Sequence, residues 1–179
     1  MSFKIKIKNK SFSNKHDKSS VKVLKDINIK IKSSEFVCIV GPSGCGKTTL
    51  MNIIGGLIEG ENQELTFNNQ ELKINENFGY VFQTSRLLPW LTVKENIELV
   101  CDERNESKER VNKLLLDFKL QEFRNYYPKS ISGGMRRKVS LARALVRNPQ
   151  VLLMDEPFVS LDQPTAENLY SVLINYWKR

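Results

Sequence analysis

Hydrophobic and polar residues alternate in two stretches of the first 32 positions, from residue 3 to 7 and from residue 27 to 31. The apolar positions are Phe3, Ile5, Ile7, Ile27, Ile29 and Ile31, and lysine fills most of the polar ones. A period of two residues is typical of a strand with one buried and one solvated face. The pattern therefore predicts two strands, joined by a loop over the polar stretch 11–20.

Two short apolar runs lack this alternation, 36–40 and 151–154. Their length and their apolar composition predict strands that are buried on both faces, as in a parallel sheet. Between them, residues 64–82 have the pattern of short strands separated by Asn-rich turns.

Apolar residues recur at helical spacing in three further regions. The spacing predicts a helix after residue 49, mostly helical structure over about 92–147 with a break at Pro128, and a last helix that opens near Pro164. The apolar residues concerned are Leu50, Ile53, Ile54, Leu57, Leu114, Leu115, Phe118, Leu169, Val172, Leu173 and Tyr176.

Composition fits one globular domain, because 179 residues with 40% apolar and 27% charged side chains can bury a core. No apolar run approaches the ~20 residues of a membrane span, and the N-terminus lacks the apolar stretch of a signal peptide. Three cysteines without a CxxC pair favour a reduced, cytosolic compartment.

The net charge of +8 is concentrated in residues 1–32, which hold ten lysines and two aspartates. The remaining residues carry equal numbers of basic and acidic groups. A solvated strand face explains the lysines. Attraction to an anionic lipid or nucleic acid is the open alternative.

Residues 41–48 match the pattern G-x-x-x-x-G-K-[ST] at every fixed position. Glycines let successive backbone N–H groups turn towards phosphate oxygens at the positive end of the following helix. We expect Lys47 to reach the β- and γ-phosphates and the Thr48 hydroxyl to ligate Mg²⁺. The predicted nucleotide-binding residues are Gly41, Pro42, Ser43, Gly44, Cys45, Gly46, Lys47, Thr48 and Thr49. A glycine-rich turn without a ligand is the alternative.

Asp155 and Glu156 follow the second apolar run directly. The carboxyl ends of parallel strands are where such sheets bind ligands. We therefore expect Asp155 to hold Mg²⁺ and Glu156 to face an attacking water, so that the site hydrolyses ATP.

Three more motifs accompany these two. Residues 131–135, Ile-Ser-Gly-Gly-Met, are similar to the signature sequence of ATP-binding cassette (ABC) ATPases, with Ile in place of the usual Leu. Read alone, Ser-Gly-Gly before a helix is also an ordinary N-cap. Gln83 matches the family's Q-loop glutamine, and residues 160–162, Ser-Leu-Asp, match its D-loop. The five motifs stand in the family's order, and the resemblance covers residues from about 3 to 179.

The resemblance implies an α/β P-loop NTPase fold of the ABC type. It would have a mixed core sheet, an N-terminal antiparallel β portion and a helical insertion. The chain would be a single domain, with a nucleotide-binding core of residues 1–90 and 148–179 and a helical subdomain of about 91–147 that carries the signature.

The resemblance also implies a division of roles around ATP and Mg²⁺. Two cassettes would pair head to tail, as a homodimer, with each ATP between the phosphate loop of one and the signature of the other. The catalytic residues would be Glu156, Gln83 and Lys47, and the metal ligands Thr48, Gln83 and Asp155. Ser132, Gly133 and Gly134 would act in trans, and Asp162 of the D-loop would also bind nucleotide. Phe12 is the candidate for stacking on adenine, with a place in the core as its alternative.

The segment 87–96 resembles the region after the Q-loop in nitrate, sulfonate and bicarbonate-type importers, and Phe158 after Pro157 favours the same class. Such a subunit would power solute transport from the cytoplasmic face of the cell membrane, as a peripheral protein. It would work with transmembrane permease subunits and, indirectly, a solute-binding protein, and without nucleic acid. Residues 51–57 suit an exporter of the lipoprotein or macrolide type equally well. An ABC ATPase of translation or DNA repair and a non-hydrolysing structural subunit are further alternatives.

The sequence departs from the family at two places. Ser34 stands where glycine is usual, which is costly only if its φ is positive. The switch histidine and the strand expected after the last helix are missing, and the sole histidine, His16, falls in a polar loop and is expected to be solvated. We therefore expect a C-terminally truncated cassette that binds ATP, hydrolyses it poorly and exposes a sheet edge prone to association. Cys45 is either a small residue that fits the loop or a reactive thiol at a helix N-terminus.

Overall fold

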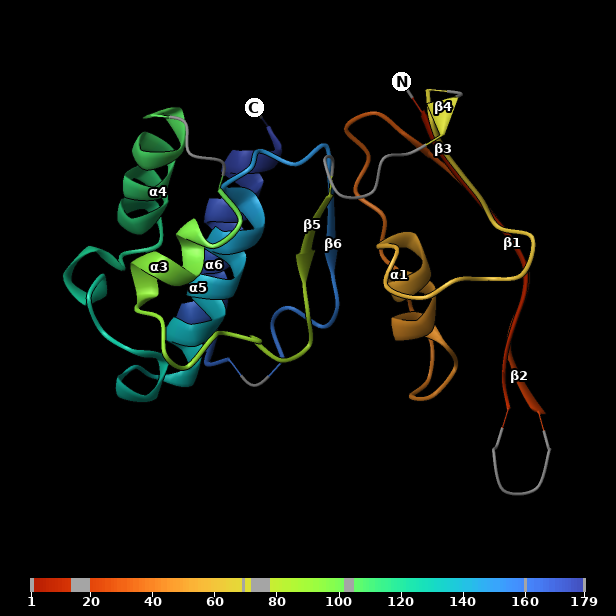
Figure 1. The fold of residues 1–179 in the computed structure, drawn as a ribbon, viewed down its shortest axis with the longest axis horizontal. Helices are drawn as coiled ribbons and strands as arrows, with labels where there is room; N and C mark the ends of the chain where they lie inside the picture. The colour runs from red at the N-terminus through yellow and green to blue at the C-terminus, as the bar shows by residue number, and fades with distance from the viewer. Residues whose placement is uncertain are drawn as a thin grey trace. The chain divides into compact units, whose positions relative to one another are not determined.

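The computed structural model describes residues 2–13, 20–68, 70–71, 78–101, 105–159 and 161–178. The chain forms two compact units, Met1–Glu76 and Asn77–Arg179. Figure 1 labels the elements of each unit. His16 and Ser160 lie outside the described residues, as does the middle of the predicted loop.

An antiparallel sheet dominates the first unit. Its strands are β1 (Ser2–Ser13), β2 (Ser20–Lys32), β3 (Glu64–Phe67) and β4 (Gln70–Glu71), in the order β2-β1-β3-β4. The predicted alternation is confirmed, since Phe3, Ile5 and Ile7 are buried whereas Lys6 and Lys8 are exposed. The expected loop over 11–20 is wrong at its ends, because residues 11–13 pair with residues 20–22 as continuations of β1 and β2. A ladder of backbone hydrogen bonds requires no apolar alternation.

Helix α1 (Lys47–Ile54) is the helix predicted after residue 49. Leu50, Ile53 and Ile54 are buried, and the helix ends at Gly55. Leu57, expected on the same apolar face, lies beyond the helix and is exposed.

The prediction of a buried strand over 36–40 is wrong. These residues form no strand and are all exposed, with Phe36 at 68% and Val40 at 88%. A continuous apolar run becomes a buried strand only where neighbouring strands flank it. Within the described part of the first unit, the sheet order has no place for this run.

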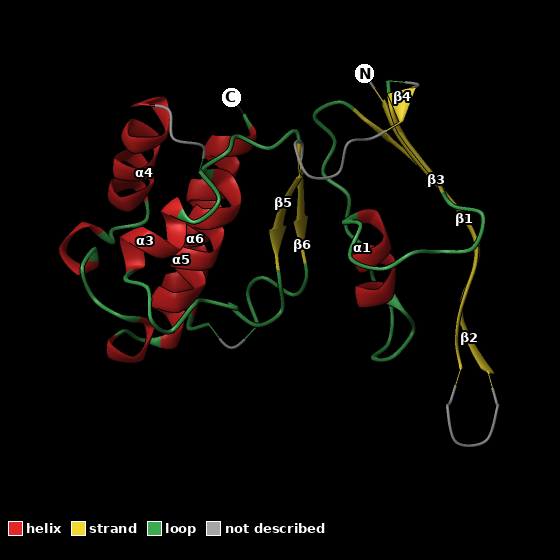
Figure 2. Cartoon of the chain, viewed as in Figure 1, coloured by secondary structure: helices red, strands yellow, loops and turns green. Residues whose placement is uncertain are grey.

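The second unit combines a small parallel sheet with a group of helices (Figure 2). Strands β5 (Phe78–Val81) and β6 (Val151–Met154) pair in parallel. The helices are α3 (Val93–Glu98), α4 (Asn105–Asp117), η1 (Gln121–Phe123), η2 (Pro128–Ser130), α5 (Gly133–Leu145) and α6 (Gln163–Trp177). The helical region, the break at Pro128, the strand after residue 150 and the last helix are thereby confirmed, although β6 is only half-buried.

The core of the second unit joins its helices to both strands. Leu114, Leu115, Phe118 and Leu169 are almost fully buried, as their helical spacing predicts. Val81 of β5 belongs to the same cluster. No helix among the described residues is both long and apolar enough to cross a bilayer.

Candidate functional site

The loop before α1 folds around the Lys47 ammonium. Lys47 Nζ donates to the carbonyl oxygens of Gly41 and Pro42, each at 2.8 Å, and lies 3.9 Å from Cys45 Sγ. An ammonium has three donors and no acceptor, so the loop places a positive charge inside its own turn. The helix N-terminus adds the positive end of a macrodipole at the same place. The arrangement suits an anion such as a phosphate.

Two glycines of the loop have a backbone that other residues rarely adopt. Gly44 has a φ of 78° and Gly46, the N-cap of α1, has a φ of 100°. A Cβ on Gly46 would also lie 2.9 Å from Val23 Cγ1 and 3.2 Å from the Val23 carbonyl oxygen. The second fixed glycine of the pattern is therefore required by both conformation and space.

Cys45 is exposed, and its sulfur lies against Gly41, where an added Cβ would come within 2.8 Å. Like Cys45, Cys38 and Cys101 form no disulfide bond. The thiol thus fits closely within the turn and remains accessible. Its proposed reactivity stays a prediction.

Ser34, which stands where glycine is usual, has a positive φ of 59°. A residue other than glycine is strained at this angle. The turn around it is closed by the Glu35 N–H, which donates to the Lys32 carbonyl at 3.3 Å, and by the Lys32 N–H, which donates to Glu35 Oε2 at 2.7 Å. Both glycine and serine can form these bonds, so the left-handed backbone is the only cost.

In the second unit, the structure brings two predicted residues into contact at the ends of β5 and β6. Gln83 Nε2 donates to Glu156 Oε2 at 2.8 Å. Gln83 follows β5 and Glu156 follows β6, and both are exposed. Because the strands are parallel, their carboxyl ends meet at one edge. The hydrogen bond fixes the direction of the Glu156 carboxylate.

Asp155 stands between β6 and Glu156 and is buried, with 5% of its surface exposed. Its backbone N–H donates to the Val81 carbonyl at 2.9 Å, which extends the strand pairing by one bond. Burial and then the charge of Asp155 raise the pKa of Tyr80 to about 12. The raised pKa keeps the phenol protonated, without a negative charge beside Asp155, well into the alkaline range.

Glu156 has a left-handed backbone, with a φ of 46°. A glutamate rarely adopts this conformation, which costs ~1–3 kcal/mol when surrounding contacts impose it. Such strain is concentrated at functional sites. Residues such as Ser34 and Arg86 share a positive φ, so the catalytic role of Glu156 stays a prediction.

A metal site in this chain would draw on oxygen ligands. Among the described residues, no group of three or more His, Cys, Asp and Glu side chains is close enough to hold a metal ion by itself. Mg²⁺ binds through one or two protein oxygens and the phosphates of its nucleotide. Thr48 in the first unit and Gln83 and Asp155 in the second carry oxygen atoms of that kind, and their role as metal ligands stays a prediction. Since Gln83 Nε2 donates to Glu156, its Oε1 is the atom left for a metal.

The signature residues stand at the start of α5. Ser132 is the N-cap, and its Oγ accepts the Met135 N–H at 3.2 Å. Gly133 and Gly134 form the first helical positions, and a Cβ on Gly133 would meet only Arg136, at 3.8 Å. The N-cap interpretation is confirmed. It does not conflict with a role in trans, which stays a prediction.

Asp162 begins α6 in the same way. Its Oδ2 accepts the Thr165 N–H at 3.1 Å, and hydrogen bonds from Thr165 hold the pKa of Asp162 below its usual range. Pro164 lies in the first turn, as predicted. The structure thus gives Asp162 a capping role, and its contact with nucleotide stays a prediction.

Phe12 lies near the end of β1 with 46% of its surface exposed. The alternative that it is a core residue is therefore wrong. The Lys10 ammonium lies 5.2 Å from its ring centroid, so one face of the ring is partnered by a cation. Stacking on adenine stays a prediction.

The segment 87–96 is held together by a buried amide that the sequence analysis missed. Asn96 is fully buried, and its Nδ2 donates to the carbonyls of Leu88, Leu91 and Thr92 while its Oδ1 accepts the Leu88 N–H at 2.8 Å. The loop so fixed presents Trp90, which is 68% exposed. Pro89, Trp90, Tyr127 and Lys129 line an open groove there.

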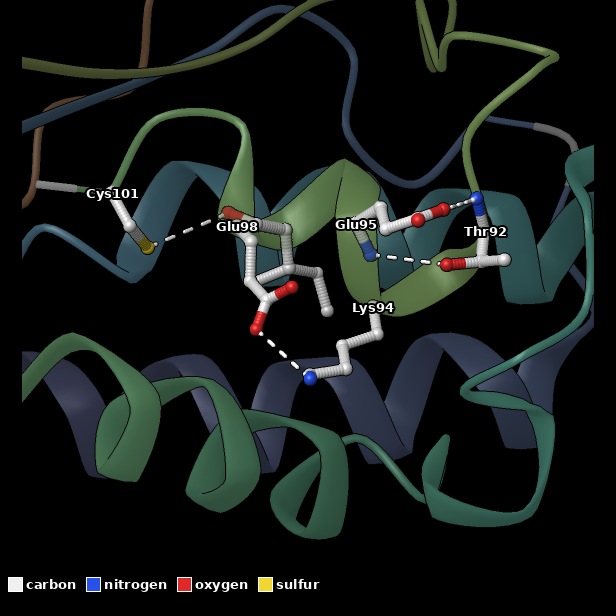
Figure 3. Close-up of polar contacts among 6 residues, drawn as sticks. Thr92, Lys94, Glu95, Glu98 and Cys101 are labelled. Atoms are coloured by element: carbon white, nitrogen blue, oxygen red, sulfur yellow. Dashed lines mark hydrogen bonds and ion pairs between the residues drawn. The ribbon is translucent and has the colours of Figure 1, made fainter. Parts of the chain in front are cut away.

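Helix α3 begins within this segment at a reciprocal cap (Figure 3). The Thr92 N–H donates to Glu95 Oε2 at 2.7 Å, and the Glu95 N–H donates to Thr92 Oγ1 at 3.3 Å. Hydrogen bonds from the backbone and then the side chain of Thr92 lower the pKa of Glu95. Lys94 and Glu98 form an ion pair at 3.3 Å on the next turn. Together these bonds give a short helix a defined start.

Arg137 is the second residue that the sequence analysis missed. It lies on α5 with only 5% of its surface exposed, and its guanidinium donates to the backbone carbonyls of Gln83 and Glu156. Leu141 and Leu145 follow it at intervals of four and are also buried. An arginine in line with an apolar helix face is the signal that could have revealed a buried cation with dedicated partners.

Comparison with known proteins agrees with these motifs. A family model described as "ABC transporter" matches residues 24–159. The chain is 43% identical over 162 residues to the aliphatic sulfonates import ATP-binding protein SsuB of a Bacillus cereus strain, an alignment of 89% of this chain and 64% of that protein. It is 39% identical over 181 residues to the protein of the same name from Bacillus subtilis, across 100% of this chain and 70% of that protein. The chain thus spans about two thirds of the length of these relatives.

Solved structures resemble the fold. A dimeric ATP-binding cassette in a post-hydrolysis state, bound to ADP and Pi, has a TM-score of 0.87 and 33% identity, covering 98% of this chain and 83% of that chain. A further dimeric structure, of a bacterial ABC transporter cassette, has a TM-score of 0.85 and 34% identity over the same shares. The predicted fold class is therefore confirmed.

Proposed function

The chain belongs to the ABC transporter family, and from this premise we propose that it binds ATP with Mg²⁺ and hydrolyses ATP to drive solute transport. The observation that carries the proposal is the loop of residues 41–48, which folds around the Lys47 ammonium at the start of α1. The Gln83–Glu156 hydrogen bond supports hydrolysis in addition to binding.

Binding of the phosphates rests on the first unit, and Mg²⁺ would also draw on residues of the second. Backbone N–H groups of the loop and the N-terminus of α1 are suited to phosphate oxygens. The Lys47 ammonium would exchange its two carbonyl acceptors for the β- and γ-phosphates, a stronger charge-assisted bond. Oxygen atoms of Thr48, Gln83 and Asp155 would hold Mg²⁺, which supplies neutralisation of phosphate charge when bound.

Hydrolysis rests on Glu156. The carboxylate would accept a proton from the attacking water while its Oε2 remains bonded to Gln83 Nε2. That bond orients the carboxylate and leaves Oε1 for the water. Because phosphoryl transfer depends mostly on positioning and charge, a base held by one defined hydrogen bond is well suited to the task.

A second copy of this chain would complete the site. The start of α5 offers Ser132, Gly133 and Gly134 at a helix N-terminus, with room beside Gly133. Such a terminus binds anions, so these residues would contact the γ-phosphate of ATP held by the partner. The chain would therefore act as a head-to-tail homodimer, with Asp162 near the shared nucleotide.

The relatives named as sulfonate importers favour an importer. We assign the exposed Trp90 and the groove beside it to contact with transmembrane permease subunits. Placed there, the chain would work as a peripheral protein at the cytoplasmic face of the membrane and would serve a solute-binding protein indirectly. The solute would be of the nitrate, sulfonate or bicarbonate type.

A binding experiment with matched lysine variants tests this function. Lys47→Ala removes a charge-assisted bond worth ~1.5–3 kcal/mol, so we expect MgATP to bind ~10-fold to 100-fold more weakly in calorimetry. Lys30→Ala makes the same charge change on an exposed strand position and should bind as the wild type. Glu156→Gln should bind normally and sediment as a dimer with MgATP. Equal binding by the two lysine variants would contradict the proposal.

A further inference from the structure

Arg137 connects the two segments that carry Gln83 and Glu156. Its Nη1 donates to the carbonyls of Phe82 and Gln83, the latter at 3.2 Å. Its Nη2 donates to the carbonyls of Asp155 at 3.3 Å and Glu156 at 2.8 Å, and its Nε donates to the Pro157 carbonyl at 2.6 Å. All the acceptors are backbone atoms just beyond the carboxyl ends of β5 and β6.

These bonds use the whole donor capacity of the side chain. A guanidinium has five N–H donors in a fixed planar fork, and each of the five contacts is made by a different carbonyl. No other residue type can make this set, because lysine has three donors and glutamine has two. The side chain therefore works as a rigid brace between residues 82–83 and 155–157.

The brace acts where the backbone is strained. Glu156 has a φ of 46°, and the bond from Arg137 Nη2 to its carbonyl is one of the contacts that hold that conformation. The opposite end of the brace holds the Gln83 carbonyl. The Gln83 and Glu156 side chains, which hydrogen-bond to each other at 2.8 Å, thus extend from backbone positions fixed by one guanidinium.

A buried cation is costly, and here the protein offsets the cost mainly with carbonyl dipoles. Burial lowers the pKa of Arg137, and the negative charge of Asp155 opposes that shift. The five acceptors are all neutral carbonyl oxygens. An apolar residue would remove the desolvation cost but would also remove the five hydrogen bonds that Arg137 donates to these carbonyls.

We propose that Arg137 is a positioning residue for ATP hydrolysis, which sets the Gln83–Glu156 pair by bracing the backbone on both sides of it. The inference rests on the proposed function, because it assigns Glu156 the role of general base. The hydrogen bonds described for Arg137 all go to backbone carbonyls, so its proposed role is indirect. Its effect on the rate passes through the direction of the Glu156 carboxylate.

Arg143 offers a matched comparison on the same helix. It donates to the carbonyls of Arg86 at 2.9 Å and Ser85 at 3.0 Å, just beyond Gln83. Burial lowers its pKa too. It therefore anchors the same loop to α5 without contacting the Glu156 segment. Loss of Arg143 should affect stability but not the pair.

Kinetics of MgATP hydrolysis by Arg137→Met, Arg137→Lys and Arg143→Met give the first test. Misplacement of a catalytic group by ~1 Å costs ~100-fold in rate, so we expect kcat of Arg137→Met to fall by about that factor with KM nearly unchanged. Arg137→Lys should lie between it and the wild type, and Arg143→Met should keep its kcat. The lysine variant keeps the charge and serves if the methionine variant does not fold.

The side-chain amide resonance of Gln83, assigned by its loss in Gln83→Ala, gives a test without turnover. In ¹⁵N-labelled protein, Glu156→Ala should shift this resonance by removing its acceptor, and Arg137→Met should shift it similarly. Arg143→Met should leave it in place. If the wild type fails to hydrolyse ATP, the proposed function fails, and this resonance still decides whether Arg137 sets the Gln83–Glu156 pair.

Two results would overturn the inference. One is an unshifted Gln83 resonance in both Arg137 variants. The other, in a wild type that hydrolyses ATP, is a kcat that stays at the wild-type value in Arg137→Met or falls equally in Arg143→Met, which would mean that the arginines only stabilise the fold.

Discussion

Ser34 and Glu156 are two of the residues other than glycine that have a left-handed backbone. Ser34, with a φ of 59°, closes the turn after β2, and Glu156, with a φ of 46°, follows Asp155. At Glu156 the strain accompanies the proposed catalytic role and is held by Arg137. At Ser34 the described contacts come from its neighbours, Lys32 and Glu35. The strain at Ser34 should therefore be removable without loss of function.

Ser34→Gly is expected to stabilise the protein. A left-handed backbone costs a residue other than glycine ~1–2 kcal/mol, and Ser34→Gly would remove this cost. Glycine also raises the conformational entropy of the unfolded chain, which cancels part of the gain in stability. The free energy of unfolding in urea should rise by about 0.5–1 kcal/mol. Ser33→Gly is the control, since Ser33 is not among the positive-φ residues and should lose stability. Equal effects of the two substitutions would show that the φ of Ser34 carries no cost.

Among individual site residues, the sequence predicted those that belong to short sequence motifs. Lys47, Thr48, Gln83, Asp155 and Glu156 were predicted by motif, and the contact of Gln83 with Glu156 is now visible. Arg137 and Asn96 were missed because their partners are backbone carbonyls. A carbonyl belongs to every residue, so such a partner leaves no mark on the sequence.

Strand β5 packs very closely against the end of α5. A Cβ on Gly79 would collide with the Ala144 carbonyl oxygen and would lie 2.9 Å from Pro149 Cγ. A backbone carbonyl and a proline ring can move little to make room. The close approach keeps β5, and Gln83 just after it, against the helix that carries Arg137.

Gly79→Ala is expected to destabilise the second unit. Overpacking by one methyl group costs ~1–3 kcal/mol where the neighbours are rigid, and the loss should appear as a lower urea midpoint with an unchanged slope. Gly133→Ala is the matched control, because its Cβ would meet only Arg136 at 3.8 Å. A midpoint for Gly79→Ala as high as that of Gly133→Ala would contradict the packing described.

At the scale of elements, periodic patterns predicted well, whereas of the two continuous apolar runs only 151–154 forms the predicted strand. The alternation in β1 and the helical spacing in α4 predicted both the element and its buried face. The spacing in α6 predicted the helix, in which Leu169 is buried and the other predicted apolar residues are half-buried. The run 36–40 has no alternation, and its burial depends on neighbours that a local pattern cannot reveal. The ends of the hairpin were missed since pairing of residues 11–13 with 20–22 rests on backbone bonds.

At the scale of the whole molecule, the excess positive charge and the residues proposed to bind and hydrolyse ATP lie in different parts of the chain. Most of the lysines described within β1 and β2 are exposed, and Lys6 pairs with Glu64 at 2.9 Å. That ion pair is exposed, so salt screens it and it contributes little. The proposed chemistry instead draws on Lys47 of the first unit and on Gln83, Asp155 and Glu156 of the second.

The family is established by a model match over residues 24–159, whereas turnover by this chain is a proposal. Both the role of Glu156 and that of Arg137 depend on it. Importer function, the permease contact at Trp90 and pairing of two copies depend on it as well, because each assumes that ATP hydrolysis drives a cycle.

Release of phosphate from MgATP by the purified chain, with Glu156→Gln as the blank, tests the central claim most directly. A positioned general base contributes ~100-fold or more to such a reaction. The account predicts that the wild type exceeds the blank by about that factor while both bind ATP equally. Equal rates of phosphate release from the two proteins, with ATP bound to both, would contradict it.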